Sequence, residues 1–463
     1  MARIILGMKL PRSIPIFIVL WGTLALALAD EDWQVGAAKI NITPEQPMAM
    51  SGYGSRDHPA EGKLTDLWAK ALVLQDASSH RAVLVTLDLV GLHRATSSEI
   101  CDSLRDSFGF ERHQISLCTS HTHTGPVVGD NLGPMAYDIL GPDQQKLVDE
   151  YANFLRGKVV TVVGDALERL VPSRLSWGSG RSTFAVNRRN NQESNVPELR
   201  TAGELQGPVD HDVPVLAVRD LDDELTAVVF GYACHATTLS FYRWSGDYPG
   251  FAQLELEANH PGCIALFFAG CGADQNPLPR RSVELAQYYG RRLATDVDAV
   301  LLTAKMLPVT GELVADYREI DLPLDTLPTR EQLESDAESS HRYVVNNARR
   351  QLAILDSGQP LSQTYPYPIG VWQIGSDVQF ITLGGEVVVD YALRLKTELA
   401  GTATWVAGYA HDVMAYIPSR RVLREGGYEG KGAMVLYGLP APWSPKIENA
   451  IIDDVHRQLG DGP

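Results

Sequence analysis

The chain has 463 residues, of which 44% are hydrophobic and 21% are charged, a composition that excludes a disordered protein and provides for a large core. Its formal net charge of -17 excludes a body that attracts nucleic acid or anionic membrane surfaces. The charge does not exclude neutral lipids, cations or amides as ligands.

The first residues predict export. A basic start is followed by an apolar run at 14–28 and by small residues at 27–29. The run has about fifteen residues, and a bilayer span needs about twenty, so a membrane anchor is the weaker alternative. We expect 1–29 to be a cleaved signal peptide and the mature chain to be secreted or periplasmic. Cleavage removes the basic residues and takes the net charge to about -20; these residues are Arg3, Lys9 and Arg12.

Short apolar runs, often without alternation, predict strands that are covered on both faces. They lie at 71–75, 82–87, 115–118, 213–218, 227–234, 263–269 and 380–383. Helical periodicity or composition predicts helices at 143–170, 283–302, 387–399 and 446–459, and a more polar surface helix at 329–356. Thr96 with Glu99 predicts a capping box. With no repeat or linker after Asp30, we expect one α/β domain of mixed β-sheets covered by helices.

The cysteines include no C-x-x-C pair and are odd in number, so they do not resemble metal ligands. We expect mostly buried thiols, with one or two disulfides after export. The five are Cys101, Cys118, Cys234, Cys263 and Cys271.

Four predicted strand ends carry side chains suited to chemistry. His121 and His123 follow one strand, and both imidazoles face one cleft if the extended backbone continues. His235 follows a second strand; alternatively it is an ordinary core histidine. Glu386 follows two glycines ahead of a helix, where the helix dipole alone favours an acid. Tyr416 lies in a loop whose tyrosines could simply pack. Together these are nitrogen and oxygen donors that zinc accepts.

Taken in order, these segments resemble the neutral (non-lysosomal) ceramidases over about residues 36–429. The matching motifs are M-S-G-Y-G at 50–54, T-L-D at 86–88, H-T-H-T-G-P at 121–126, N-R at 187–188, His235, S-G-D at 245–247, G-E at 385–386, the G-Y-A…A-Y-I run that ends at 417, and Y-E at 428–429. The resemblance implies zinc held by His121, His235, Glu386 and Tyr416.

The resemblance also implies roles around the metal. His123 would support the ligands or transfer a proton. Arg188 would face the substrate carbonyl or the product carboxylate, and Asp247 of the S-G-D motif would also bind substrate; the alternative for Arg188 is a surface arginine.

The sequence departs from the family at the nucleophile, which lies in a D-x-S-P-N type segment. Here residues 270–277 read G-C-G-A-D-Q-N-P, and Asn276 occupies the serine position. Because an amide cannot attack a carbonyl, we expect attack by a zinc-bound water, with His123 or Asp274 accepting the proton. Asn276 would then donate a hydrogen bond to the oxyanion, worth about 3–4 kcal/mol, or alternatively only shape the turn.

Longer family members continue into a C-terminal β-sandwich, whereas this chain ends at Pro463. We therefore expect residues 30–463 to correspond to the catalytic domain alone, and a small soluble N-acyl compound fits as well as ceramide.

The leading hypothesis is a zinc-dependent amidohydrolase that cleaves a small-molecule or lipid N-acyl amide, ceramide-like, into a fatty acid and an amine. The alternatives are a zinc esterase or peptide-type amidase, and a catalytically silent homologue that binds lipid or glycan.

Overall fold

The computed structural model describes residues 33–302, 306–401 and 403–460, so the predicted signal peptide at 1–29 lies outside the described residues. Within them, nine strands form one sheet in the order β11-β9-β8-β6-β1-β3-β4-β5, with β13 paired to β6. Its strands are β1 (Trp33–Asn41), β3 (Trp68–Asp76), β4 (Arg81–Leu87), β5 (Ile115–Thr119), β6 (Val171–Arg181), β8 (Asp212–Arg219), β9 (Leu225–Tyr232), β11 (Ile264–Ala269) and β13 (Leu307–Val309).

A second sheet has four strands in the order β14-β15-β16-β18. They are β14 (Leu313–Pro323), β15 (Thr364–Ile374), β16 (Val378–Leu383) and β18 (Ala403–Ala407). Three short ladders pair β2 (Gly62–Lys63) with β10 (Arg243–Trp244), β7 (Ala185–Asn187) with β12 (Gln275–Pro277), and β17 (Glu386–Val387) with β19 (Tyr416–Ile417).

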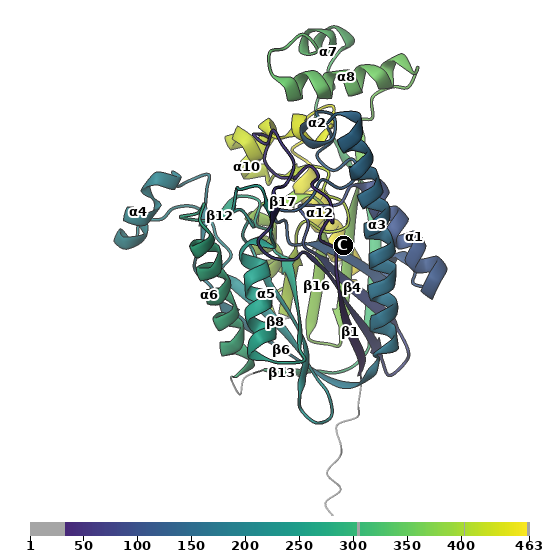
Figure 1. Cartoon of the computed structure of the whole chain (residues 1–463), viewed down its shortest axis with the longest axis vertical. Coiled ribbons are helices and arrows are strands. Elements are labelled where there is room, and N and C mark those ends of the chain that lie inside the picture. Colours follow the sequence, from purple (N-terminus) through teal and green to yellow (C-terminus); the bar gives the residue numbers. More distant parts are fainter. Residues whose placement is uncertain (1–32, 303–305, 402, 461–463) are drawn as a thin grey trace, which may run out of the picture.

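Helices cover both sheets. They are α1 (Arg94–Phe108), α2 (Gly133–Ala136), α3 (Pro142–Glu168), α4 (Val196–Ala202), α5 (Asp247–Asn259), α6 (Val283–Leu301), α7 (Arg330–Asp336), α8 (Arg342–Asp356), α9 (Val389–Glu398), α10 (Arg420–Glu425), α11 (Met434–Tyr437) and α12 (Ile447–Gln458). Figure 1 shows α1 and α3 on one side of the strands, α5 and α6 on the other side, and α7 with α8 at one end. Helices α9 and α12 contact the four-stranded sheet.

The large sheet curves until its edge strands β5 and β11 contact each other. On β3, Ala71 and Val73 belong to the core beneath α1 and α3, whereas Leu72 and Leu74 belong to a core shared with the four-stranded sheet. Both faces of the strand are therefore buried in apolar surroundings. This explains why the predicted strands do not alternate in polarity.

All seven predicted strands are confirmed, with ends that differ by a few residues. The helices predicted at 143–170, 283–302, 387–399 and 446–459 are confirmed as α3, α6, α9 and α12. The mixed α/β fold with helices over the sheets is likewise confirmed.

Three expectations about local structure are wrong. The polar helix at 329–356 is two helices, α7 and α8, and Thr329 makes a capping box at the start of α7. Helix α1 begins at Arg94 with His93 as N-cap, so Thr96 already lies inside the first turn and caps nothing. All five cysteines are buried and free, and the expected disulfides do not form. Cys101, Cys118 and Cys271 lie in three separate apolar clusters, and Cys234 and Cys263 belong to a fourth.

Three β-α-β units bring together the loops that carry the predicted site residues. The units β4-α1-β5, β9-α5-β11 and β16-α9-β18 each join two parallel, hydrogen-bonded strands. The loop after β18 links the other two units, because His411 N donates to Leu117 O at 2.7 Å and Gly408 N donates to Ala269 O at 3.0 Å. The carboxyl ends of these strands therefore meet at one place, where α/β proteins commonly bind ligands.

Candidate metal centre

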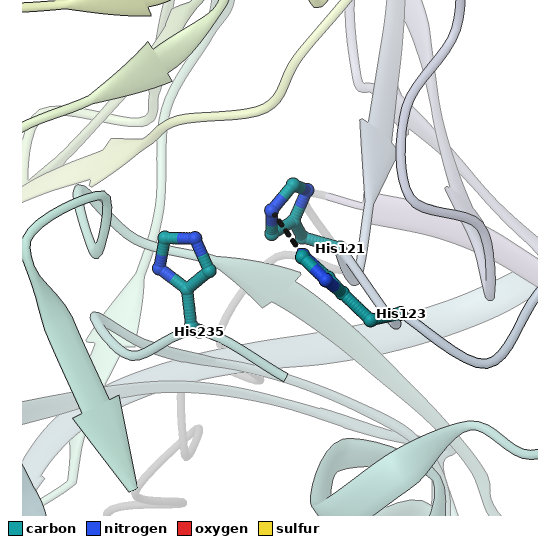
Figure 2. Close-up of side chains that lie close together, drawn as sticks. All are labelled: His121, His123 and His235. Atoms are coloured by element: carbon teal, nitrogen blue, oxygen red, sulfur yellow. Dashed lines mark hydrogen bonds between the residues drawn. The ribbon is translucent and has the colours of Figure 1, made fainter. Parts of the chain in front are cut away.

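Three imidazoles converge at this meeting point. His121, His123 and His235 are buried, and one nitrogen from each lies within 4.8 Å of the others. Figure 2 shows the three rings pointing toward one another, with His121 and His123 from one loop and His235 from another. The Nε2 atoms of His121 and His123 are 3.0 Å apart.

Glu386 and Tyr416 complete the cluster. Glu386 Oε2 lies 3.3 Å from His121 Nε2 and 3.1 Å from His235 Nε2. Tyr416 Oη lies 3.4 Å from His235 Nε2. The two residues are paired across the β17–β19 ladder, which fixes the carboxylate beside the phenol. Glu386 lies in this short strand, three residues before the first residue of α9, as expected for an acid ahead of a helix. The structure thus places all four side chains predicted to hold a metal around one point.

The two histidines of the H-T-H segment converge for a different reason from the one expected. Strand β5 ends at Thr119, and His121 adopts a left-handed backbone with φ 57°, so the extended conformation does not continue. Tyr409 and His411 also have left-handed φ values, of 54° and 60°. Such conformations cost free energy in residues other than glycine and concentrate at functional sites.

Backbone carbonyls orient two of the imidazoles. His121 Nδ1 lies 2.6 Å from Val90 O, and His235 Nδ1 lies 2.8 Å from Gly272 O. With the proton on each Nδ1, Nε2 carries a lone pair that can bind a metal ion on the side that faces Glu386. This is the arrangement usual for histidines that bind a metal.

The donor set fits a divalent cation. Glu386 Oε2 is buried and has no hydrogen-bond partner among the described residues, although two imidazole nitrogens face it. Burial lowers the pKa of His123 well below its usual range and that of His235 to about 4, so both rings are neutral near pH 7. Burial alone would raise the pKa of Glu386, but the facing imidazoles hold it well below its usual range. Neutral imidazoles and a carboxylate are the forms that bind metals.

Arg188 and Asn276 lie beside the cluster. The β7–β12 ladder places the end of β7 next to Asn276, and Arg188 follows directly. Arg188 Nη2 donates to Tyr416 Oη at 3.1 Å, and Nη1 donates to Asn276 Oδ1 at 3.3 Å. Arg188 Nε donates to Glu429 Oε1 at 2.8 Å. The guanidinium is thus held against the predicted ligand Tyr416.

Two other predicted site residues make different contacts. Asp274 accepts hydrogen bonds from Val389 N at 2.9 Å and from Asn187 Nδ2 at 3.0 Å, so its carboxylate braces the start of α9. Asp247 accepts from Leu239 N at 2.8 Å and from Tyr248 N at 2.6 Å, which braces the loop after His235. Both carboxylates are buried and satisfied by these contacts, and burial raises the pKa of each to about 6.

Two tyrosines that no sequence motif assigned also contact the cluster. Tyr437 Oη donates to Glu386 Oε1, on the carboxylate oxygen opposite the imidazoles. Tyr409 stacks on His121, with ring centroids 4.2 Å apart. Tyr409 lies in the G-Y-A segment, so a sequence motif could have pointed to it. Tyr437 lies in the short helix α11, where no motif marks it.

Two cavities are lined by residues that contact the cluster. One, of about 500 Å³, is lined by Arg188 and Asn276. The other, of about 340 Å³, is lined by Gly52 and Tyr53. These two residues contact His123: its ring would lie 2.6 Å from a Cβ at position 52, and the Tyr53 ring centroid is 4.8 Å away.

Residues 33–266, half of the chain, match the profile of the family described as neutral/alkaline non-lysosomal ceramidase, N-terminal. The chain belongs to this family. The chain is 26% identical to "Neutral ceramidase" of Pseudomonas aeruginosa over 247 residues, which cover 51% of this chain and 36% of that protein. It is 24% identical to "Neutral ceramidase B" of Dictyostelium discoideum over 242 residues, which cover 50% of this chain and 33% of that protein. The sequence match thus covers about a third of the length of these curated relatives.

Two solved ceramidase structures share the fold of this chain. The crystal structure of neutral ceramidase from Pseudomonas aeruginosa matches with a TM-score of 0.71 at 21% identity, over 93% of this chain and 75% of that chain. A structure titled "Ceramidase complexed with C2" matches with a TM-score of 0.72 at 19% identity, over 93% of this chain and 76% of that chain. The likeness of fold therefore extends beyond the residues that match in sequence.

Among the helices of the described residues, none has the length and apolarity of a membrane span.

Proposed function

We propose that this member of the family is a zinc-dependent amidohydrolase that cleaves N-acyl amides. The observation that carries the proposal is the buried oxygen of Glu386, which faces two imidazole nitrogens at 3.1 Å and 3.3 Å with no hydrogen-bond partner in the described chain. Such a group costs free energy unless a cation compensates it. His121, His235, Glu386 and Tyr416 would be the ligands.

A bound zinc ion supplies Lewis acidity, which lowers the pKa of water and polarises an amide carbonyl. The protein side chains would do the rest. The Arg188 guanidinium, held against Tyr416, would donate to the carbonyl oxygen of the amide and later to the carboxylate product. Asn276 accepts from Arg188 through Oδ1, so its amide NH₂ can be offered to the developing oxyanion.

The nucleophile is proposed to be water, because the position of the family's serine holds Asn276. His123 is the proton acceptor we propose, since its Nε2 lies within the cluster and its Nδ1 has no hydrogen-bond partner among the described residues. Asp274 is less suited to that role, because both of its oxygens accept hydrogen bonds that brace α9.

The relatives' names support a ceramide-like lipid as the first substrate to try, and the predicted signal peptide supports export. A zinc esterase or peptide-type amidase would use the same side chains. A silent binding homologue is a weaker alternative, because such a protein has no need for four converged metal donors.

Metal analysis and a substrate panel test the proposal. Purified protein should contain about one zinc ion per chain, and His121→Ala should lose most of it. The wild type should release amine from an N-acyl amide faster than it hydrolyses the matching ester or a peptide. Unchanged metal content in His121→Ala would remove the assigned site. Bound metal with no hydrolysis of any compound would favour the silent homologue.

A further inference from the structure

The cavity beside Arg188 is built from charged side chains. We call it the polar cavity: about 500 Å³, with three arginines and three glutamates in its lining. These are Arg188, Arg189, Arg280, Glu193, Glu425 and Glu429. Leu278 and Tyr428 are the only large apolar side chains of the lining.

The charges of the polar cavity are paired with one another. Arg188 Nε lies 2.8 Å from Glu429 Oε1, and Arg189 Nη1 lies 2.6 Å from Glu429 Oε2. Arg280 Nη2 lies 2.9 Å from Glu193 Oε2. Three cations and three anions leave no net charge, so the wall favours groups that form hydrogen bonds over ions of either sign. A hydrocarbon chain placed here would remove water from these pairs without replacing its hydrogen bonds, which is unfavourable.

The second cavity, of about 340 Å³, has a different lining, and we call it the mixed cavity. Met50, Met135, Ile139 and Leu140 form an apolar part of its wall, and a polar part is formed by Arg56, Asp57, His58, Gln144 and Arg342. It borders His123 through Gly52 and Tyr53, whereas the polar cavity borders Tyr416 through Arg188. The apolar part of the mixed cavity thus suits a hydrocarbon chain, and the polar cavity suits polar groups. Residues of the two linings contact opposite members of the cluster, His123 and Tyr416.

We propose that the substrates are N-acyl amides with one hydrocarbon chain: the acyl chain lies in the mixed cavity, and the amine part, hydrophilic and without a second long chain, lies in the polar cavity. This inference rests on the proposed hydrolase function. Hydrolysis breaks the C–N bond; the acyl carbon takes the hydroxyl of water, and the nitrogen takes its proton. The products are a carboxylic acid and a hydrophilic amine.

Two matched amides test the proposal. N-octanoyl-serinol and N-octanoyl-sphinganine share the acyl chain and the 2-amino-1,3-diol and differ in the long alkyl tail of the sphinganine. Amine release is measured with the purified, metal-loaded full chain in the same detergent for both compounds. We expect kcat/KM to be at least about tenfold higher for the serinol amide.

A variant in which part of the lining is apolar tests the role of the polar cavity. The double variant Glu193→Leu/Arg280→Leu removes an ion pair that touches none of the four metal donors, together with the second contact of Glu193, which is to Arg281. It should lower kcat/KM for the serinol amide, raise it for the sphinganine amide and leave metal content unchanged. The matched control is Arg330→Leu/Asp356→Leu, which removes an exposed ion pair of α7 and α8 and should change neither value.

Three results would overturn the inference. The first is equal or faster hydrolysis of the sphinganine amide by the wild type. The second is a double variant with the same preference as the wild type. The third is hydrolysis of neither amide while metal is bound, which would remove the proposed function as well and so is distinguishable from the other two.

Discussion

Tyr437→Phe removes one hydroxyl group from the surroundings of the proposed metal donors. In the wild type this hydroxyl donates to Glu386 Oε1, while Oε2 faces the imidazoles. Burial and the charge of Glu386 raise the pKa of Tyr437 well above its usual value, so the phenol keeps its proton and remains a donor. Phenylalanine keeps the ring, so the change isolates the hydrogen bond that orients the carboxylate.

The expected effect is on metal affinity. Loss of an outer hydrogen bond to a metal ligand typically weakens binding about 10- to 100-fold, which corresponds to about 1.4–2.8 kcal/mol. The measurement is competition for zinc against a chelator of known affinity, with the variant and the wild type at the same pH.

Tyr151→Phe is the matched control, because Tyr151 is buried, Tyr437 is half-buried, and each donates a side-chain hydrogen bond; that of Tyr151 goes to Ile42 O at 2.7 Å, from a different helix. Both variants should lose about 1 kcal/mol of stability in a urea titration. Only Tyr437→Phe should lose zinc affinity. The reasoning is refuted if the two variants bind zinc equally tightly.

The remaining predictions concern the oxyanion, the brace of α9, and pH. Asn276→Ala should lower kcat about 10²–10³-fold with unchanged metal content if the amide donates to the oxyanion; an unchanged kcat in steady-state assays would leave Asn276 as a turn residue. Asp274→Ala should lose about 1–3 kcal/mol of unfolding free energy, because Val389 N and Asn187 lose their acceptor; urea titration measures this, and normal stability with abolished turnover would instead favour the proton-transfer role. For the metal-free protein, the pKa of His235 is lowered to about 4 when folded and rises toward its usual value on unfolding, so the unfolded state binds the proton first as pH falls. The melting temperature of that protein should therefore drop between about pH 6.5 and pH 4, and His235→Gln should flatten the drop; an equally steep drop in His235→Gln would assign it to other groups.

The sequence alone determined the local structure and the types of side chain available to bind a metal. Strands such as β4 and helices such as α3 follow from apolar spacing over a few residues, which the backbone imposes directly. Histidines, a glutamate and a tyrosine at four strand ends predicted a zinc site, and the family resemblance supplied their grouping. That resemblance also made Asn276 conspicuous, because it fills the serine position.

Only the tertiary structure decided how these residues act together. Glu386 and Tyr437 are 51 positions apart, and no local pattern links them. The direction of the His121 ring depends on a left-handed backbone after β5, and the Asp274 carboxylate turns to α9 because that helix happens to begin beside it. Whether a polar side chain faces the metal or braces a loop depends on the elements that pack around it, and packing between segments distant in sequence leaves no trace in local periodicity.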